Sequence, residues 1–226
     1  MMPPPGDPWR TGGWPLLNIA AICTATHALG PGVRAVVWVQ GCPHDCPGCL
    51  APDWIPMRQA RCVAPEDLVT EVLAHLQVTG LTFSGGEPMM QAVGLARLIH
   101  LARQQRPLSL ICFSGFTLAQ LRYDPPGPGV ADLLAEIDVL IDGRYIAAQN
   151  DNRGLRGSRN QHIHYLTDRL AAFNFAAEPR QVEIQVGNGH AFLVGVPPHG
   201  VVPLVEQAIE QTRARLLVQV PDNDTD

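Results

Sequence analysis

The sequence predicts an α/β fold around a parallel sheet, followed by a separate α+β unit at the C-terminal end. Strand-like and helix-like segments alternate between residues 16 and 143, and such alternation is typical of parallel strands joined by crossover helices. Chemically distinctive residues follow directly after several of the predicted strands. From residue 182 onward, two β-rich runs surround Gly-Asn-Gly, which indicates an antiparallel hairpin.

The first half of the chain contains three predicted strands and one helix. Residues 16–23 are apolar enough for a strand, and residues 33–40 are rich in β-branched side chains that suit a buried strand. A helix is expected over residues 65–78, because a proline and two acidic residues precede apolar residues at helical spacing. A short strand over residues 81–84 then ends in a glycine pair.

The second half continues the alternation as far as residue 143. A helix is expected over residues 91–105 and ends before Pro107, since proline cannot continue a helix. The remaining elements expected in this half are a strand over 108–114, short helices over 117–122 and 130–137, and a strand over 138–143.

The C-terminal part has a different pattern and is predicted to be an addition to the sheet. Its hairpin is expected over residues 182–197, and an amphipathic helix follows it. The chain is therefore divided into a flexible tail (1–13), a core (14–168) and a hairpin–helix extension (169–226).

The amino-acid composition is typical of a globular protein, and the lack of long apolar runs bears on where the protein is expected to be located. The chain has 226 residues, of which 46% are hydrophobic and 16% charged, values that suit one sizeable domain with an appendage. Its longest apolar runs are too short to cross a membrane, and its start lacks the basic and apolar regions of a signal peptide. A cytoplasmic location without a membrane partner is expected, in which thiols stay reduced.

The charged residues exclude two further classes of function. All 16 basic residues are arginine, so no mechanism can use a lysine Schiff base or a phosphate-loop lysine. The net charge is −5 and no basic block is present. Because binding to phosphates needs clustered cations, a nucleic-acid partner is not expected.

Three closely spaced cysteines are the strongest chemical signal. Cys42, Cys46 and Cys49 form the pattern CxxxCxxC in GCPHDCPGC. They can bind three irons of a 4Fe–4S cluster, whereas a complete set of protein ligands has four cysteines. A zinc site with His44 as fourth ligand is the alternative, although structural zinc sites commonly combine two close pairs. The other cysteines are expected to be small buried side chains: Cys23, Cys62 and Cys112.

A second motif, TFSGGEP at residues 82–88, follows a predicted strand. Gly85 and Gly86 would let a ligand approach the backbone, and Glu87 could accept hydrogen bonds from an ammonium group. The alternative is an ordinary turn from strand to helix. Since parallel sheets place ligands at the carboxyl ends of their strands, this motif and the cysteines should converge.

Together these motifs resemble the radical S-adenosylmethionine (SAM) enzymes. Within that superfamily the chain resembles the small activating enzyme of anaerobic ribonucleotide reductase and its relatives. The resemblance covers roughly residues 16–165 and has four parts: LGPGVRAVVWVQGCPHDCPGC, TFSGGEP, DVLIDGRY and LRGSRNQ. It implies a partial (β/α)6-type barrel for the core.

The resemblance also implies two cofactors and a reaction. Cys42, Cys46 and Cys49 would bind a 4Fe–4S cluster, whose open iron would bind SAM. The run from Gly85 to Glu87 would hold the SAM amine, with Pro88 shaping the turn. A reduced flavodoxin or ferredoxin would supply an electron, and SAM would break down to methionine and a 5′-deoxyadenosyl radical that abstracts hydrogen. The cofactors supply this chemistry, while the protein positions them and excludes water.

Further residues enter the site only through the resemblance. Asp142 and Arg144 could contact SAM or organise its pocket, or form a surface ion pair at a strand end. Ser114 could bind SAM or cap the next helix. The RGS-x-NQ run is implied to lie near the substrate opening, although a surface loop could have the same composition; it consists of Arg156, Ser158, Asn160 and Gln161. The histidines without a surrounding motif are expected to be structural or solvated: His27, His162 and His164.

Two features bear on the substrate. Gly48 precedes the third cysteine, where many radical SAM enzymes have an aromatic residue, and this favours the activating subgroup; it leaves adenine contacts to the backbone, Leu50 or Trp54. The extension after the RGS-x-NQ run has no counterpart in the minimal activator. Hydrogen abstraction from a glycine of a glycyl-radical enzyme is the leading hypothesis. Modification of another protein or peptide is the alternative, and a non-enzymatic iron–sulfur or zinc module is a remote one.

Overall fold

A computed structural model describes residues 10–11, 14–187 and 190–218. The chain forms two compact units, Met1–Val196 and Pro197–Asp226. The predicted boundary after residue 168 differs from this division, because the hairpin belongs to the first unit. The predicted tail over residues 1–13 falls mainly outside the described residues.

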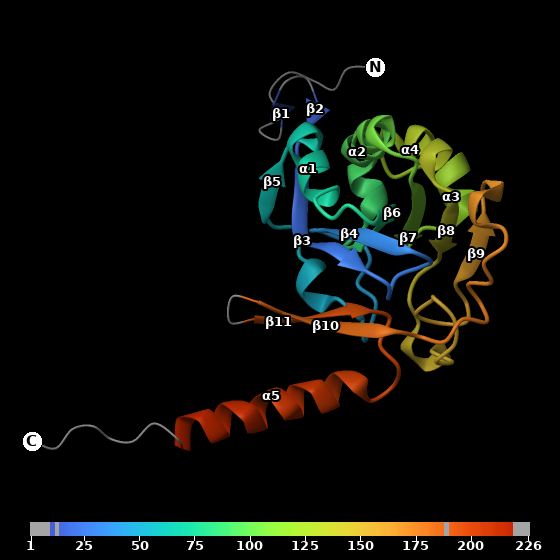
Figure 1. Cartoon of the computed structure of the whole chain (residues 1–226). Coiled ribbons are helices and arrows are strands. Elements are labelled where there is room, and N and C mark those ends of the chain that lie inside the picture. The colour runs from blue at the N-terminus through green and yellow to red at the C-terminus, as the bar shows by residue number, and fades with distance from the viewer. Residues whose placement is uncertain (1–9, 12–13, 188–189, 219–226) are drawn as a thin grey trace, which may run out of the picture. The chain divides into compact units, whose positions relative to one another are not determined.

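A mixed sheet of seven strands organises the first unit (Figure 1). In chain order the strands are β3 (Leu17–Thr26), β4 (Val33–Val39), β5 (Arg61–Val63), β6 (Val78–Gly85), β7 (Ser109–Ser114), β8 (Val139–Asp142) and β9 (His162–Tyr165). Across the sheet their order is β5-β3-β4-β6-β7-β8-β9. Two short strands near the N-terminus, β1 (Arg10–Thr11) and β2 (Trp14–Pro15), form a separate antiparallel pair.

The prediction of a parallel sheet is correct only for its centre. Strands β4, β6, β7 and β8 are parallel, whereas β3, β5 and β9 are antiparallel to their neighbours. The turn after β3 is short enough to return the chain directly, so β3 and β4 pair as neighbours without a crossover helix. The sheet is therefore mixed α/β, with a parallel core between antiparallel edges.

Four α-helices connect the strands and cover one side of the sheet (Figure 1). They are α1 (Pro65–Val72), α2 (Ala92–Gln105), α3 (Leu118–Tyr123) and α4 (Val130–Glu136). Four 3-10 turns lie between the elements: η1 (Pro52–Trp54), η2 (Pro88–Gln91), η3 (Ala147–Gln149) and η4 (Asp168–Leu170). The first helix ends earlier than predicted, at Val72, and a turn over residues 73–77 leads into strand β6 at Val78.

Side chains alternate between two hydrophobic clusters, as expected for strands covered on both faces. Leu81, Phe83 and Cys112 pack with the helices on one face. On the other face, Val36 and Ile111 pack with residues from the C-terminal part of the unit. This second cluster explains why the central strands are apolar on both faces.

The hairpin covers the side of the sheet opposite the helices (Figure 1). Its strands β10 (Val182–Gly187) and β11 (His190–Gly195) pair antiparallel, which confirms the predicted hairpin. The Phe192 ring lies 5.1 Å from the Trp38 ring, measured between centroids. Glu183 Oε2 accepts a 2.7 Å hydrogen bond from Thr26 Oγ1. Apolar and polar contacts thus join the hairpin to β3 and β4.

The second unit contains helix α5 (Val201–Val218), which was expected from the amphipathic pattern. In the part of the chain that the structure describes, no helix combines the length and apolar character needed to cross a membrane.

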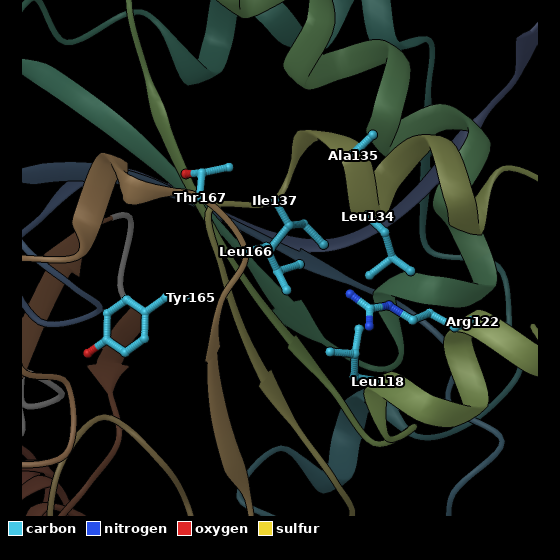
Figure 2. Close-up of a pocket in the computed structure, with 8 residues that line it drawn as sticks. All are labelled: Leu118, Arg122, Leu134, Ala135, Ile137, Tyr165, Leu166 and Thr167. Carbon is cyan, nitrogen blue, oxygen red and sulfur yellow. The ribbon is translucent and has the colours of Figure 1, made fainter.

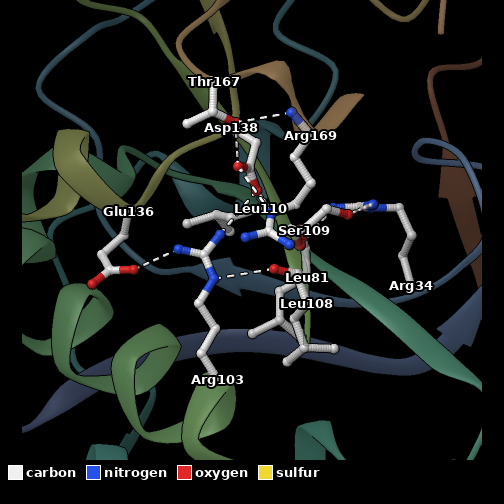
Figure 3. Close-up of polar contacts among 10 residues, drawn as sticks. All are labelled: Arg34, Leu81, Arg103, Leu108, Ser109, Leu110, Glu136, Asp138, Thr167 and Arg169. Carbon is white, nitrogen blue, oxygen red and sulfur yellow. Dashed lines mark hydrogen bonds and ion pairs between the residues drawn. The ribbon is translucent and has the colours of Figure 1, made fainter. Parts of the chain in front are cut away.

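A group of buried charges lies at the end of the sheet opposite the cysteine loop (Figure 3). Arg34 is fully buried, and burial lowers the pKa of its guanidinium to about 9. Its Nε donates to Thr82 Oγ1 at 2.7 Å. Asp138 is also buried and accepts hydrogen bonds from Arg103 Nη2 at 2.9 Å and from the Leu110 amide at 2.7 Å. These contacts join α2, β7 and β8.

Replacement of Asp138 by alanine is expected to destabilise the protein by roughly 2–3 kcal/mol, because the buried Leu110 amide loses its acceptor and the partly buried Arg103 keeps only one of its two carboxylate partners, Glu136. Denaturant unfolding should measure the change. Glu71→Ala is the control: it removes an exposed ion pair with Arg61 and should cost at most about 1 kcal/mol. Equal effects of the two substitutions would contradict the prediction.

Candidate active site

The cysteine loop leaves the end of β4 and is fixed there by backbone hydrogen bonds. Gly41 N donates to Trp54 O at 2.9 Å, and Cys42 N donates to Ile55 O at 3.0 Å. The segment after the third cysteine therefore returns to the start of the loop. The three thiols lie on a closed loop at the carboxyl end of a central parallel strand.

The three thiols are partly buried, and none forms a disulfide. Burial raises the pKa of Cys42 to about 11 and also raises the pKa of Cys49. The sulfur of Cys42 accepts a bond from His44 N, and that of Cys49 accepts one from Ala51 N, each at 3.4 Å. These N–H groups would stabilise thiolates, which are the form that binds iron. Three thiols with such donors fit an iron–sulfur cluster.

The glycine pair of the second motif lies directly against the cysteine loop. Gly86 N donates to Val39 O at 2.7 Å, and Glu87 N donates to Gly41 O at 2.9 Å. Gly85 has a φ of +104°, and a Cβ on Gly86 would lie 2.2 Å from the Gly41 oxygen. Both positions therefore require glycine. The structure thus brings together the two motifs expected to converge.

The carboxylate of Glu87 faces the protein interior. Its side chain is 1% exposed; Oε1 accepts from Met89 N and Ser114 Oγ, each at 2.9 Å. Oε2 accepts from Gly115 N at 2.7 Å. Three protein donors occupy the carboxylate that was expected to receive the SAM amine. In this arrangement Glu87 holds the ends of β6 and β7 together.

Burial raises the pKa of Glu87 to about 7, although its three hydrogen bonds act in the opposite direction. Since the folded pKa lies above the ordinary value of a glutamate, protonated Glu87 favours the folded state at low pH. The stability that protonated Glu87 contributes is fully present below the unfolded pKa and is lost as the pH rises through the folded pKa of about 7.

The Glu87→Gln variant should therefore lose less stability than the wild type between pH 4.5 and 8. The relative change in unfolding free energy should reach about 3 kcal/mol, since each pKa unit corresponds to about 1.4 kcal/mol. Chemical unfolding of both proteins across this pH range measures it. Parallel stability curves would contradict the prediction.

Ser114 and Asp142 lie beside this turn but bind other parts of the protein. Ser114 Oγ donates to Glu87 Oε1 and accepts from Phe116 N at 3.1 Å. The cap of α3 is Thr117, so Ser114 is not the N-cap of that helix. Asp142 Oδ2 accepts a hydrogen bond from the Leu118 amide. Both side chains therefore position the strand ends and the start of α3.

His44 belongs to the site, although its role was not predicted beyond the zinc alternative. Its ring packs on Phe116 at a centroid distance of 4.5 Å, and its Nε2 lies 3.9 Å from Glu87 Oε2. Burial, followed by the charge of Arg144, lowers the pKa of His44. This places the exposed Arg144 within electrostatic range of the cysteine loop. Only the position of His44 between the cysteines signalled a role.

The RGS-x-NQ run stabilises the chain that follows β8. Gln161 Oε1 accepts from Gly157 N at 2.8 Å, and its Nε2 donates to Gly143 O at 2.8 Å. Ser158 Oγ accepts from Ile146 N at 3.1 Å. Arg156 forms an ion pair with Asp151 at 2.9 Å. The contacts of this run are therefore structural, and they hold the loop that carries Arg144.

A cavity of about 290 Å³ lies elsewhere, between α3, α4 and the end of β9 (Figure 2). The site residues expected from the sequence do not line it. Its lining mixes apolar and polar side chains and consists of Leu118, Arg122, Leu134, Ala135, Ile137, Tyr165, Leu166 and Thr167.

Comparisons with known proteins agree with the two motifs. Residues 28–164 match the family model described as "4Fe-4S single cluster domain". Anaerobic ribonucleoside-triphosphate reductase-activating proteins from Vibrio cholerae and Escherichia coli are 34% and 31% identical, and each match covers 61% of this chain and 91% of the relative. The protein of this name from phage T4 is 28% identical over 67% of this chain and 96% of its own length. The crystal structure of QueE from Escherichia coli has a TM-score of 0.35 and 16% identity, over 45% of this chain and 52% of its own, a similarity too low to define the fold.

Proposed function

The chain belongs to the family of anaerobic ribonucleoside-triphosphate reductase-activating proteins, which are radical SAM enzymes with a 4Fe–4S cluster, and on that premise we propose that it generates a glycyl radical in a partner protein. The core that carries this activity is proposed to span residues 14–168, which contain the whole matched region. The proposed substrate is a polypeptide rather than a small molecule.

The observation that carries the proposal is the direct backbone attachment of the glycine turn to the cysteine loop. Two hydrogen bonds, Gly86 N to Val39 O and Glu87 N to Gly41 O, join the motifs at 2.7 and 2.9 Å. A ligand held by the glycine backbone would therefore lie next to a cluster held by the thiols. A cluster that binds SAM through its open iron requires the thiols and the SAM-binding backbone to lie this close together.

The residues fit both cofactors. Cys42, Cys46 and Cys49 would hold the cluster, and the backbone of Gly85 and Gly86 would approach the methionyl amine of SAM. When bound together, the two cofactors supply the one-electron cleavage of SAM that yields the 5′-deoxyadenosyl radical used for hydrogen abstraction. The thiols must lose their protons when iron binds, since burial favours their neutral form.

The protein's own contribution is to fix this geometry. Glu87 and Ser114 hold the ends of β6 and β7 through their 2.9 Å hydrogen bond. Asp142 fixes the start of α3, and Gln161 fixes the loop of Arg144. Arg144 would supply positive charge beside the cysteine loop, since its charge acts on His44. Such preorganisation keeps the reacting groups close without reorganisation during the reaction.

A second candidate, modification of a different protein or peptide, is favoured by the hairpin. The hairpin lies outside the matched residues 28–164, and its Phe192 ring is 5.1 Å from Trp38 and 6.2 Å from Trp54. The hairpin therefore covers the face of the sheet on which Trp38 of β4 lies, and it also packs near Trp54 of η1, which follows the cysteine loop. A partner that differs from the relatives' reductase would account for this addition.

Anaerobic reconstitution with iron and sulfide, followed by SAM and dithionite, tests the reaction. Formation of 5′-deoxyadenosine is expected, and its absence from a protein loaded with four irons would refute the proposal. Anaerobic ribonucleotide reductase labelled with α-deuterated glycine then tests the substrate: deuterium should appear in 5′-deoxyadenosine, with a glycyl radical visible by electron paramagnetic resonance. SAM cleavage without deuterium transfer would favour the second candidate. Reduced flavodoxin and ferredoxin can replace dithionite in turn to identify the proposed donor.

A further inference from the structure

A second group of metal-binding residue types lies at the edge of the sheet, between β8 and β9. Asp142, His162 and His164 each offer one ligand atom, and these atoms lie within 4.8 Å of one another. Asp142 pairs with His162 across the two strands, and His164 follows two residues later on the same face. The three side chains thus converge because of strand register.

Their separations suit one small cation. His164 Nε2 lies 2.9 Å from Asp142 Oδ2, and His162 Nδ1 lies 3.4 Å from Asp142 Oδ1. Metal bonds from histidine nitrogen and carboxylate oxygen are about 2.0–2.2 Å long, which separates neighbouring ligands by roughly 3–3.6 Å in octahedral or tetrahedral geometry. Only small side-chain adjustments would be needed to bind an ion.

Two of these atoms are buried and lack hydrogen bonds. Asp142 is 1% exposed, and among the residues that the structure describes neither its Oδ1 nor His164 Nε2 forms a hydrogen bond. A buried carboxylate oxygen without a donor is costly. Close nitrogen and oxygen lone pairs also repel one another unless a proton or a metal ion lies between them. The other carboxylate oxygen accepts from the Leu118 amide, an outer contact of the kind that orients metal ligands.

We propose that Asp142, His162 and His164 form a second metal site, separate from the cysteine loop, for a divalent first-row transition metal such as zinc. Two imidazoles and one carboxylate suit zinc or iron(II) better than calcium or magnesium, which prefer oxygen ligands. The side chains of His162 and His164 are 72% and 32% exposed, so water can complete the coordination. The bound ion would tie the edge strand β9 to the end of β8.

Zinc titration of the cluster-loaded protein tests the site. We expect one zinc per chain in addition to the cluster iron, measured by elemental analysis after removal of free metal. The double variant H162A/H164A should bind zinc at least about 100-fold more weakly by calorimetry, because only one of the three ligands remains. The matched control is His27→Ala, which removes an exposed histidine outside this group. Wild-type zinc affinity in the double variant would refute the proposal, as would absence of bound zinc in the wild type.

Cobalt(II) provides a second measurement that does not depend on an intact cluster. In the cluster-free protein, thiolate–cobalt sites absorb strongly in the near ultraviolet through charge transfer, whereas nitrogen and oxygen ligands give only weak visible bands. The double variant should lose a component of the visible bands and keep the thiolate absorption. Unchanged visible bands in a folded double variant, checked by circular dichroism, would overturn the assignment. This outcome is independent of SAM cleavage, which reports on the proposed function.

Discussion

Replacement of Cys42 by alanine is expected to remove the cluster and to reduce 5′-deoxyadenosine formation by at least about 1000-fold, or roughly 4 kcal/mol of activation free energy. Two remaining thiols cannot hold a cluster that three protein ligands and SAM complete. Iron analysis, visible absorption and product chromatography after anaerobic reconstitution measure the effect.

Cys62→Ala is the matched control for this experiment. Cys62 is partly buried like the loop cysteines, and its sulfur forms a long 3.9 Å contact with Asn18 Oδ1. Its replacement should leave iron content and SAM cleavage close to the wild type. If the Cys42 variant bound four irons and cleaved SAM at the wild-type rate, the proposed ligand set would be wrong.

Replacement of Gly86 by alanine is expected to weaken SAM binding by at least about 100-fold and to destabilise the protein by about 3 kcal/mol. The new Cβ would lie 2.2 Å from the oxygen and 2.7 Å from the carbon of the Gly41 carbonyl. These atoms belong to the backbone, so the turn and the cysteine loop must separate. Equilibrium dialysis with SAM and denaturant unfolding measure the two effects.

Gly127→Ala controls for the loss of a glycine in itself. A Cβ at Gly127 would have no neighbour within 4 Å, so SAM affinity should remain unchanged and stability should change little. Wild-type SAM affinity in the Gly86 variant would show that the contact between the two motifs does not position SAM.

Local sequence patterns predicted most of the helices and central strands correctly. The β-branched run at Val33–Val39 forms β4, and the helix expected before Pro107 forms α2. Strands β5 and β9 were not predicted, because each has only three or four residues and no clear alternation. Such strands depend on hydrogen bonds to β3 and β8, which short sequence patterns do not encode.

In the site, the sequence likewise predicted which residues take part, but not how their side chains are oriented. The glycine turn and the cysteine loop were expected to converge, and they are in contact. The direction of the Glu87 carboxylate was not predictable, since it depends on donors from Ser114 and Gly115 on the next strand. The histidines of β9 were expected to be structural or solvated, and strand register alone brings them to Asp142.

The sequence by itself determined the chemistry of this protein, because the spacing of Cys42, Cys46 and Cys49 and the Gly-Gly-Glu run are local properties of the chain. Only the tertiary structure decided which groups face the cofactors and which stabilise the fold. Burial and strand pairing turn Glu87 inward, bring His162 and His164 to Asp142, and join the hairpin to the first compact unit. These outcomes depend on contacts between residues far apart in sequence, and their energies arise only when the sheet has formed.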